Sequence, residues 1–143
     1  MLKQNIKVAA DAMVFRKNAA QLQLLLIKRK NEPGIGLWAI PGGFVEDDEE
    51  LEAAAIRELQ EETGLSLPTM KQLYTFGKVG RDTRFRTVSV VYYTVLDRTD
   101  QKVAGGDDAA DAQWINVEDI KELAFDHIEV LNFALQKLKN ELQ

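Results

Sequence analysis

A glutamate-rich segment between two glycines, residues 43–65, constrains this chain more than any other part of its sequence. It reads GFVEDDEELEAAAIRELQEETGL, and most of its residues favour a helix. Three of its glutamates, Glu58, Glu61 and Glu62, fall within five residues. Like charges three or four residues apart on a helix cost about 0.2–0.5 kcal/mol per pair. A bound cation would give this arrangement a physical reason.

The ends of this helix can be predicted from local signals. We expect it to begin near residues 47–48, because Asp47 with Glu50 forms a weak capping-box pattern and acidic residues suit a helix N-terminus. It should end at about Thr63, since Gly64 is a natural residue to follow the last turn. The glutamates therefore lie in the last turns of a single helix.

The three glutamates share one side of this predicted helix. At about 100° per residue, with Glu58 at zero, Glu62 lies at about 40° and Glu61 at about −60°. The apolar residues 51, 54 and 55 lie on the same side, so the acidic cluster continues a core-facing stripe. Geometry alone leaves two interpretations, a solvated charged face or a cation site. The absence of lysine from this segment favours the cation site.

Composition limits the ligands that such a cation site can use. The chain has 143 residues, the usual size of one domain, with no cysteine and a single histidine, His127. Thiolate zinc sites and multi-histidine sites are therefore excluded. Any metal must bind oxygen ligands, which suits Mg²⁺, Mn²⁺ or Ca²⁺.

Charge and hydropathy indicate the setting in which the protein works. The net charge of −5 provides no general positive field for nucleic acid. The sequence shows no signal peptide and no apolar run of membrane-spanning length. We therefore expect one cytoplasmic domain, residues 1–143, with neither nucleic acid nor a membrane as a partner.

Strand and helix patterns alternate along the rest of the chain. Residues 6–15 and 22–28 predict a β-hairpin, and residues 37–40 predict a short strand that Pro41-Gly42-Gly43 breaks. The other expected elements are strands at 70–79, 85–96 and 113–117, a loop at 105–112, one or two helical turns at 118–123, and an amphipathic helix running from its N-cap, Asp126, to the end.

The glutamate-rich segment resembles the nudix box, a motif of the form G-x5-E-x7-R-E-U-x-E-E-x-G-U in which U is aliphatic. The matching residues are Gly43, Glu49, Arg57, Glu58, Leu59, Glu61, Glu62, Gly64 and Leu65, with no departure. At average residue frequencies, nine fixed positions arise by chance on the order of once in 10⁹ starting points. The resemblance implies an α/β nudix fold, an α/β/α sandwich with a mixed central sheet. The box helix should cover one side of that sheet and the C-terminal helix the other.

This resemblance also implies a reaction, the hydrolysis of a nucleoside diphosphate linked to another group. The expected cofactor is Mg²⁺, with Mn²⁺ as an alternative. By motif position, Glu58 and Glu62 correspond to the main metal ligands, and Glu61 to a further ligand. The carbonyl of Gly42 resembles the backbone oxygen that completes the metal shell, and Arg57 resembles a support that orients the acids.

The general base is left open by the sequence. In the family it is often an acid in the loop before a late strand, and Asp107, Asp108 and Asp111 precede Trp114 in this way. We select Asp108 as the catalytic candidate, with Glu61 as its competitor. Aspartates that follow two glycines also have a simple alternative role, which is to form a turn.

The segments outside the box resemble one branch of the family, the ADP-ribose pyrophosphatases and the nudix domains of NAD-metabolism proteins. The similar segments are R-x-x-E-P (29–33), G-R-D (80–82), V-S-V (88–90), the D-D-A loop and A-F-D-H (124–127). The implied substrate is ADP-ribose, cleaved to AMP and ribose 5-phosphate. Arg29, Arg81 and Arg84 are candidates for phosphate contacts, because arginine suits bidentate binding of phosphate. Phe44 is a candidate for stacking on adenine.

Two alternatives to this function stay open at this point. One is a pyrophosphohydrolase of a (d)NTP or a nucleotide sugar, which the box alone does not exclude. The other is a module that binds ADP-ribose without turnover, as in relatives that fuse this domain to a winged helix. The complete box and the absence of a basic recognition helix favour the enzyme. Because many relatives are homodimers, a homodimer is also an expectation.

Overall fold

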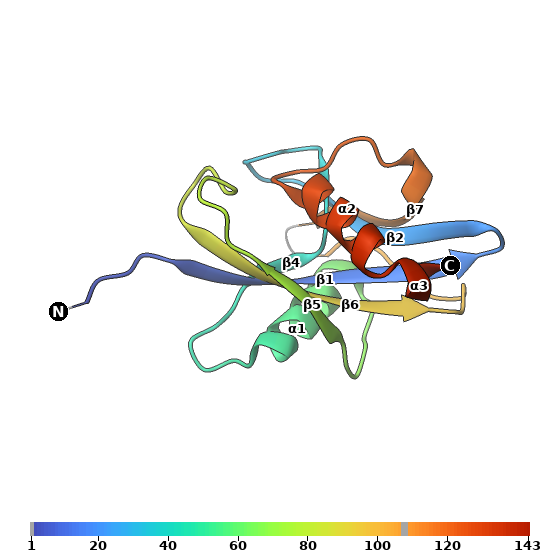
Figure 1. Ribbon diagram of the computed structural model, residues 1–143, viewed down its shortest axis with the longest axis horizontal. Coiled ribbons are helices and arrows are strands. Elements are labelled where there is room, and N and C mark those ends of the chain that lie inside the picture. Colours follow the sequence, from blue (N-terminus) through green and yellow to red (C-terminus); the bar gives the residue numbers. More distant parts are fainter. Residues whose placement is uncertain (1, 107–108) are drawn as a thin grey trace.

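A mixed β-sheet lies at the centre of the computed structural model, which describes residues 2–106 and 109–143 (Figure 1). In these ranges the strands are β1 (Lys7–Asn18), β2 (Gln21–Arg29), β3 (Trp38–Ala39), β4 (Gly42–Phe44), β5 (Lys71–Phe76), β6 (Thr87–Leu96) and β7 (Ala109–Asn116). The helices are α1 (Leu51–Thr63), the 3-10 helix η1 (Val117–Asp119), α2 (His127–Lys137) and α3 (Lys139–Leu142).

The strand order of the sheet is β3-β2-β1-β6-β5, and β1 lies at its centre. Strands β1 and β6 are parallel, whereas β1 and β2 form the antiparallel hairpin that the sequence predicts. Strand β4 adds to β1, and β7 adds to β2, both antiparallel. The mixed sheet expected from the nudix resemblance is therefore confirmed.

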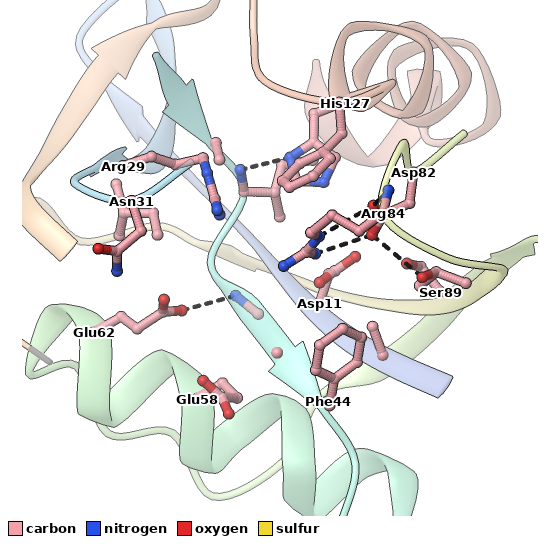
Figure 2. A pocket seen from close by; sticks show the side chains of 18 of the residues that line it. Asp11, Arg29, Asn31, Phe44, Glu58, Glu62, Asp82, Arg84, Ser89 and His127 are labelled. Atoms are coloured by element: carbon pink, nitrogen blue, oxygen red, sulfur yellow. Dashed lines mark hydrogen bonds and ion pairs between the residues drawn. The ribbon is translucent and has the colours of Figure 1, made fainter. Parts of the chain in front are cut away.

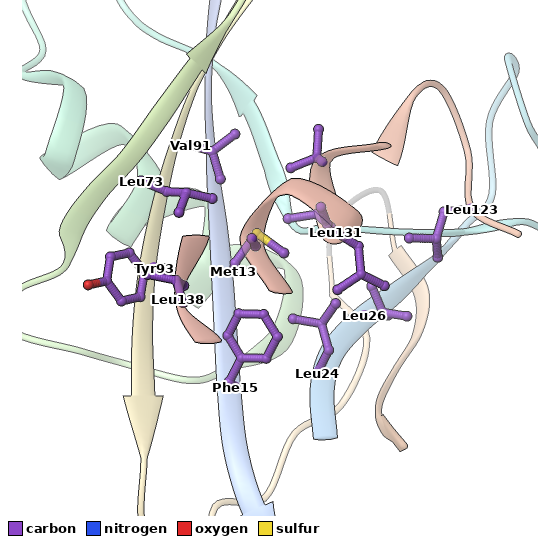
Figure 3. Close-up of a cluster of buried hydrophobic side chains, with 13 residues drawn as sticks. Met13, Phe15, Leu24, Leu26, Leu73, Val91, Tyr93, Leu123, Leu131 and Leu138 are labelled. Carbon is purple, nitrogen blue, oxygen red and sulfur yellow. The ribbon is translucent and has the colours of Figure 1, made fainter. Parts of the chain in front are cut away.

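Alternation along β1 separates two hydrophobic cores. Ala12 and Val14 point to one face and pack with Leu59 of α1. Met13 and Phe15 point to the other face, where α2 covers them, as Figure 3 shows for the cluster that includes Leu24, Leu26 and Leu131. Full burial of each large apolar side chain contributes about 1.5–3 kcal/mol. The two helices are thus held on opposite faces, which confirms the predicted α/β/α layering (Figure 1).

Helix α1 is shorter than the sequence predicts. It begins at Leu51 instead of residues 47–48, and its N-cap residue, Glu50, has no side-chain capping bond among the described residues. The reason is a contact across the loop, because the carboxylate of Glu49 accepts a hydrogen bond from Arg57 Nε at 2.6 Å. This contact holds the preceding residues in a loop.

Two strands extend beyond the sequence prediction. The strand before Pro41 ends as predicted, but Gly42 and Gly43 also begin β4, because the chain resumes pairing with β1 at this point. Strand β7 begins at Ala109 within the expected loop 105–112, because its first residues also pair with β2. A loop prediction based on turn-forming residues cannot include such a distant strand partner.

The C-terminal elements also differ from the sequence prediction. The expected helical turns at 118–123 reduce to the 3-10 helix η1, and the last helix is interrupted at Leu138. Asp126 occupies the predicted N-cap position but forms no side-chain capping bond among the described residues. Its carboxylate binds Arg81 instead. None of the helices in the described ranges has the length and apolar character needed to cross a bilayer.

Candidate active site

A hollow of about 400 Å³ opens where β1, β4 and α1 meet the loop before β6 and the start of α2 (Figure 2). It gathers predicted residues from distant parts of the chain: Arg29, Gly42, Phe44, Arg57, Glu58, Glu62, Arg81 and Arg84. Within the described part of the chain, Glu61 is not in this lining, and its side chain is 37% exposed. Asp108, the candidate base, lies outside the described residues.

The glycine pair at the start of β4 lets the strand approach the acids of α1. A Cβ on Gly43 would lie 2.5 Å from the carboxyl carbon of Glu58. The N–H of Gly42 donates to Glu62 Oε1 at 2.8 Å (Figure 2). Because any larger residue at position 43 would displace Glu58, glycine is what allows both carboxylates to lie against this turn.

Arg57 organises the acids of α1 and the loop before it. Its Nε lies 2.6 Å from Glu49 Oε2, and its Nη1 lies 2.9 Å from Glu58 Oε1 and 3.2 Å from Glu61 Oε2. The hydrogen bond from Arg57 is the main reason that the pKa of Glu49 is lowered. One guanidinium among three carboxylates leaves an excess of negative charge at this end of the hollow.

The donor set at this end suits a hard divalent cation. Burial raises the pKa of Glu58, so its ionised form lacks full solvation, and a nearby cation would stabilise it. Among the described residues, no three acidic or histidine side chains already form a metal-binding group. Mg²⁺ is usually bound by one or two carboxylates supplemented by water and substrate phosphates. Glu58, Glu62 and the backbone of Gly42 are the groups placed to contribute.

The floor of the hollow carries a buried acid, Asp11, that the sequence patterns did not predict as a site residue. Asp11 is 6% exposed and lies so close to Gly42 that a Cβ there would be 1.9 Å from Asp11 Oδ1. Burial raises the pKa of Asp11 to about 7. The available signal was an aspartate within an otherwise apolar strand, since such a residue needs a buried partner.

His127, whose role the sequence leaves undecided, also lines the hollow. Its Nδ1 accepts the backbone N–H of Ile40 at 3.0 Å (Figure 2). Burial lowers the pKa of His127 to about 4, so the ring is neutral at physiological pH. With Nδ1 as acceptor, the ring proton is on Nε2, which makes the imidazole a neutral hydrogen-bond donor.

Arginines and aromatic rings lie across the hollow from the acids. Asp82 binds Arg84 through Nε at 3.1 Å and Nη2 at 2.9 Å. The guanidinium carbon of Arg84 lies 5.6 Å from the ring centre of Phe44 and 5.5 Å from that of Phe125. Arg29 lies 4.8 Å from the Phe125 ring. This end of the hollow therefore offers cations and flat apolar surfaces side by side.

Phe125 adopts an unusual backbone conformation at this position. Its φ is 53°, in the left-handed region that side chains other than glycine rarely adopt. The aromatic ring lies near both Arg29 and Arg84, so the strained residue is part of the hollow. Such strain persists where surrounding contacts hold it and is common at ligand sites.

Comparison with known proteins gives both a family match and curated relatives. Residues 6–133 match the NUDIX domain family. The chain is 40% identical over 125 residues to the ADP-ribose pyrophosphatase of Methanocaldococcus jannaschii, covering 87% of this chain and 70% of that protein. It is 35% identical over 140 residues to the ADPR responsive transcriptional repressor NtrR of Acinetobacter baylyi. That match covers 94% of this chain and 55% of the repressor, so the chain spans about half of the repressor's length.

Solved structures with the same fold include proteins with bound nucleotides. The NUDIX domain of Shewanella oneidensis NrtR complexed with ADP ribose has a TM-score of 0.87 at 34% identity, covering 96% of this chain and 90% of that one. A bifunctional NMN adenylyltransferase/ADP ribose pyrophosphatase from Francisella tularensis, complexed with AMP and a Mn ion, has a TM-score of 0.84 at 31% identity. That match covers 94% of this chain and 42% of the Francisella protein.

Proposed function

The chain belongs to the NUDIX domain family, and from this premise we propose that it hydrolyses ADP-ribose to AMP and ribose 5-phosphate with Mg²⁺ as cofactor. Membership of the family confirms the nudix resemblance and the expectation of a pyrophosphohydrolase. One observation carries the proposal for this chain. The carboxylates of Glu58 and Glu62 lie against the glycine turn of β4, at one end of a hollow whose other end holds Arg29 and Arg84.

This division of charge fits a diphosphate linked to two organic groups. A divalent cation bound near Glu58 and Glu62 neutralises phosphate charge and lowers the pKa of bound water. The protein's own cations, Arg29 and Arg84, face the same hollow and suit the remaining phosphate oxygens. The neutral Nε2–H of His127 adds a donor that brings no charge. Phe44 and Phe125 supply apolar surface for a base or a sugar face.

The choice of ADP-ribose and of Mg²⁺ rests on relatives and on ligand chemistry. The Methanocaldococcus relative is an ADP-ribose pyrophosphatase, and the Shewanella NUDIX domain is complexed with ADP ribose. The Francisella structure contains a Mn ion, which takes the same oxygen ligands as Mg²⁺. We therefore propose Mg²⁺ as the working ion and Mn²⁺ as a substitute.

The roles of individual residues are part of this proposal. Glu58 and Glu62 bind the cation, with the carbonyl of Gly42, and Arg57 orients the acids. Glu61 stays a candidate for a further ligand or for the base, because its contact with Arg57 leaves it beside the other acids. Asp108 stays a candidate base. Replacing Glu61 with Gln tests its two roles, because a large loss of kcat that a higher Mg²⁺ concentration does not restore favours Glu61 as the base, whereas a loss that Mg²⁺ restores favours a metal ligand.

A substrate panel tests the proposed substrate directly. Values of kcat/KM are measured with Mg²⁺ for ADP-ribose, several (d)NTPs and several nucleotide sugars. We expect ADP-ribose to rank first, with AMP and ribose 5-phosphate as products in equal amounts. A higher kcat/KM for a (d)NTP or a nucleotide sugar would contradict the proposal and favour the corresponding alternative.

A second function, ligand sensing without turnover, is favoured by two of the comparisons. The chain matches the Acinetobacter repressor over 94% of its own length, and a Shewanella NrtR structure contains a 27mer DNA. The net charge of −5 and the complete box favour the enzyme for this chain. Binding of ADP-ribose with no release of AMP at any Mg²⁺ concentration would support the sensor instead.

A further inference from the structure

We propose that Arg81 is a positioning residue that holds the floor and one wall of the hollow in place, instead of binding the ligand's phosphates. This inference rests on the proposed function only for the identity of the ligand. Its physical basis is a chain of contacts from Asp126 through Arg81 to Ser89, which lies beside Asp11 on the same face of the sheet. That chain crosses from the start of α2 to the centre of the sheet.

Each nitrogen of the Arg81 guanidinium donates a hydrogen bond to a protein group. Its Nε donates to Asp126 Oδ2 at 2.9 Å, and its Nη2 donates to Asp126 Oδ1 at 2.9 Å. Its Nη1 donates to Ser89 Oγ at 2.6 Å. Two parallel bonds to one carboxylate fix the plane of the guanidinium, and the third bond fixes its direction. All three nitrogens therefore have partners within the protein.

Ser89 transmits this position to the floor of the hollow. The register of the parallel strands pairs Ala9 with Ser89 and Asp11 with Val91, so Ser89 and Asp11 point to the same face of the sheet. The Ser89 hydroxyl accepts from Arg81. Burial raises the pKa of the neighbouring Asp11 carboxyl, and hydrogen bonding to Ser89 acts in the opposite direction. Asp11 is thereby held next to Gly42, in the middle of the lining that Figure 2 shows.

The other end of the chain fixes the wall that carries His127. Asp126 directly precedes His127, and its carboxylate is committed to Arg81 instead of to capping α2. The same contact ties the loop before β6, which carries Arg84, to the start of α2. A change at Arg81 should therefore alter the position of both ligand-facing residues without removing either.

Burial distinguishes Arg81 from the arginines proposed to contact phosphate. The side chain of Arg81 is 4% exposed, whereas that of Arg84 is 36% exposed. Arg81 also borders a second hollow of about 510 Å³, together with Asp126 and Phe125. The Arg81–Asp126 pair is thus a partition between the two hollows.

The test compares ligand binding in variants along the chain. Affinity for ADP-ribose is measured by calorimetry in EDTA, so that turnover does not interfere, and kcat and KM are measured separately with Mg²⁺. The variants are Arg81→Lys, Ser89→Ala, Asp126→Asn and the double variant Arg81→Lys/Ser89→Ala. The exposed pair Arg98–Asp100 provides the matched control, Arg98→Lys.

If Arg81 is a positioning residue, then Ser89→Ala and Asp126→Asn should weaken ligand binding as much as Arg81→Lys does, although neither residue contacts the ligand. Each single variant should bind ADP-ribose about tenfold more weakly, which corresponds to about 1.4 kcal/mol. The double variant should be no worse than Arg81→Lys alone, because both changes break the same chain. Ser89→Thr, which keeps the hydroxyl, should restore most of the affinity, and Arg98→Lys should bind normally.

Two outcomes would overturn the inference. If Arg81→Lys binds weakly while Ser89→Ala and Asp126→Asn bind like the wild type, Arg81 contacts the ligand directly. If all variants bind like the wild type, the chain has no role in the site. Failure of the proposed function is distinguishable, because it appears in the wild-type substrate panel before any variant is made. In that case the same comparison is run with the substrate that ranks first.

Discussion

Replacing Gly43 with alanine should strongly lower activity while leaving the fold nearly unchanged. The added Cβ would lie 2.5 Å from both the carboxyl carbon and Oε1 of Glu58. Ordinary contact requires about 3.5 Å, so the carboxylate must move by about 1 Å. A displacement of about 1 Å at a catalytic group can cost on the order of 10²-fold in rate. We expect a loss of this size in kcat/KM, with a higher Mg²⁺ concentration needed for half-maximal activity.

The stability of this variant should change little, because the group that must move is the end of a flexible side chain. Alanine also restricts the unfolded chain relative to glycine, which stabilises the fold by about 0.4–1 kcal/mol. We expect the free energy of unfolding to stay within about 1 kcal/mol of the wild type, or about 4 °C in Tm.

The same substitution one residue earlier provides the control. A Cβ on Gly42 would lie 1.9 Å from Asp11 Oδ1, 2.7 Å from the carbonyl oxygen of Ala10 and 2.8 Å from the Cα of Asp11. These contacts include the backbone of the central strand β1, which cannot shift cheaply. Gly42→Ala should therefore destabilise the protein by about 1–3 kcal/mol or more, and Tm should fall by several degrees.

Thermal unfolding and Mg²⁺-dependent kinetics of the two variants separate fold from function. Wild-type activity of Gly43→Ala at every Mg²⁺ concentration would refute the reasoning, because Glu58 would then not act from its observed position. Equal loss of stability in both variants would also refute it, since the two contacts differ in kind.

Three further predictions concern charge in and around the hollow. Burial lowers the pKa of His127 from 6.5 to about 4, so the unfolded chain takes up a proton before the folded protein does as pH falls. The free energy of unfolding should therefore drop by up to about 3 kcal/mol between pH 6.5 and 4. Urea titrations of His127→Gln should not show this drop. Burial raises the pKa of Asp11 from 3.8 to about 7, so the folded protein holds this proton more tightly than the unfolded chain does. The contribution of Asp11 to the free energy of unfolding is therefore highest at low pH and falls as pH rises from 3.8 to 7. Asp11→Asn should therefore gain stability relative to the wild type over this range, by up to about 4 kcal/mol in the same titrations. Arg57→Lys should lower kcat/KM by about 10–100-fold, because lysine cannot bind Glu49 and Glu58 together in the geometry of the guanidinium; steady-state kinetics would contradict this if the variant matched the wild type.

Local sequence signals predicted the helices, strands and turns that depend on residues close together in the sequence. The β1–β2 hairpin, the helix ending at Gly64 and the apolar stripe of α2 follow from periodicity and from residues that form turns. Gly64 has a φ of 79°, the left-handed conformation that its position at the end of α1 requires. The motif spacing of Glu58 and Glu62 also placed both acids on the face of α1 that meets the hollow.

The remaining features depend on partners that are distant in the sequence. Aspartate is a common N-cap residue, but the carboxylate of Asp126 accepts two charge-assisted hydrogen bonds from Arg81 instead of capping α2. Ser89 and Asp11 are adjacent only because β6 pairs with β1 in one particular register. Asp11 carries one local signal, an acid within an otherwise apolar strand, but that signal does not identify its neighbours, and periodicity alone could not place Ser89 beside it. Functional sites are where local signals and the fold are expected to disagree.

The central claim is that carboxylates of α1 hold a divalent cation that drives hydrolysis of ADP-ribose. It is tested most directly by measuring AMP release from ADP-ribose across a Mg²⁺ titration in Glu62→Gln and Glu52→Gln. The first variant keeps an oxygen to accept the Gly42 N–H. The second variant is the matched control, because Glu52 lies on the same helix and also accepts a backbone N–H, that of Met70 at 3.0 Å.

We predict Mg²⁺-dependent release of AMP by the wild type and by Glu52→Gln. At saturating Mg²⁺, the rate of Glu62→Gln should be lower than that of the wild type by a factor of about 10² or more. Hydrolysis by Glu62→Gln at the wild-type rate, or release of AMP by the wild type in EDTA, would contradict the claim.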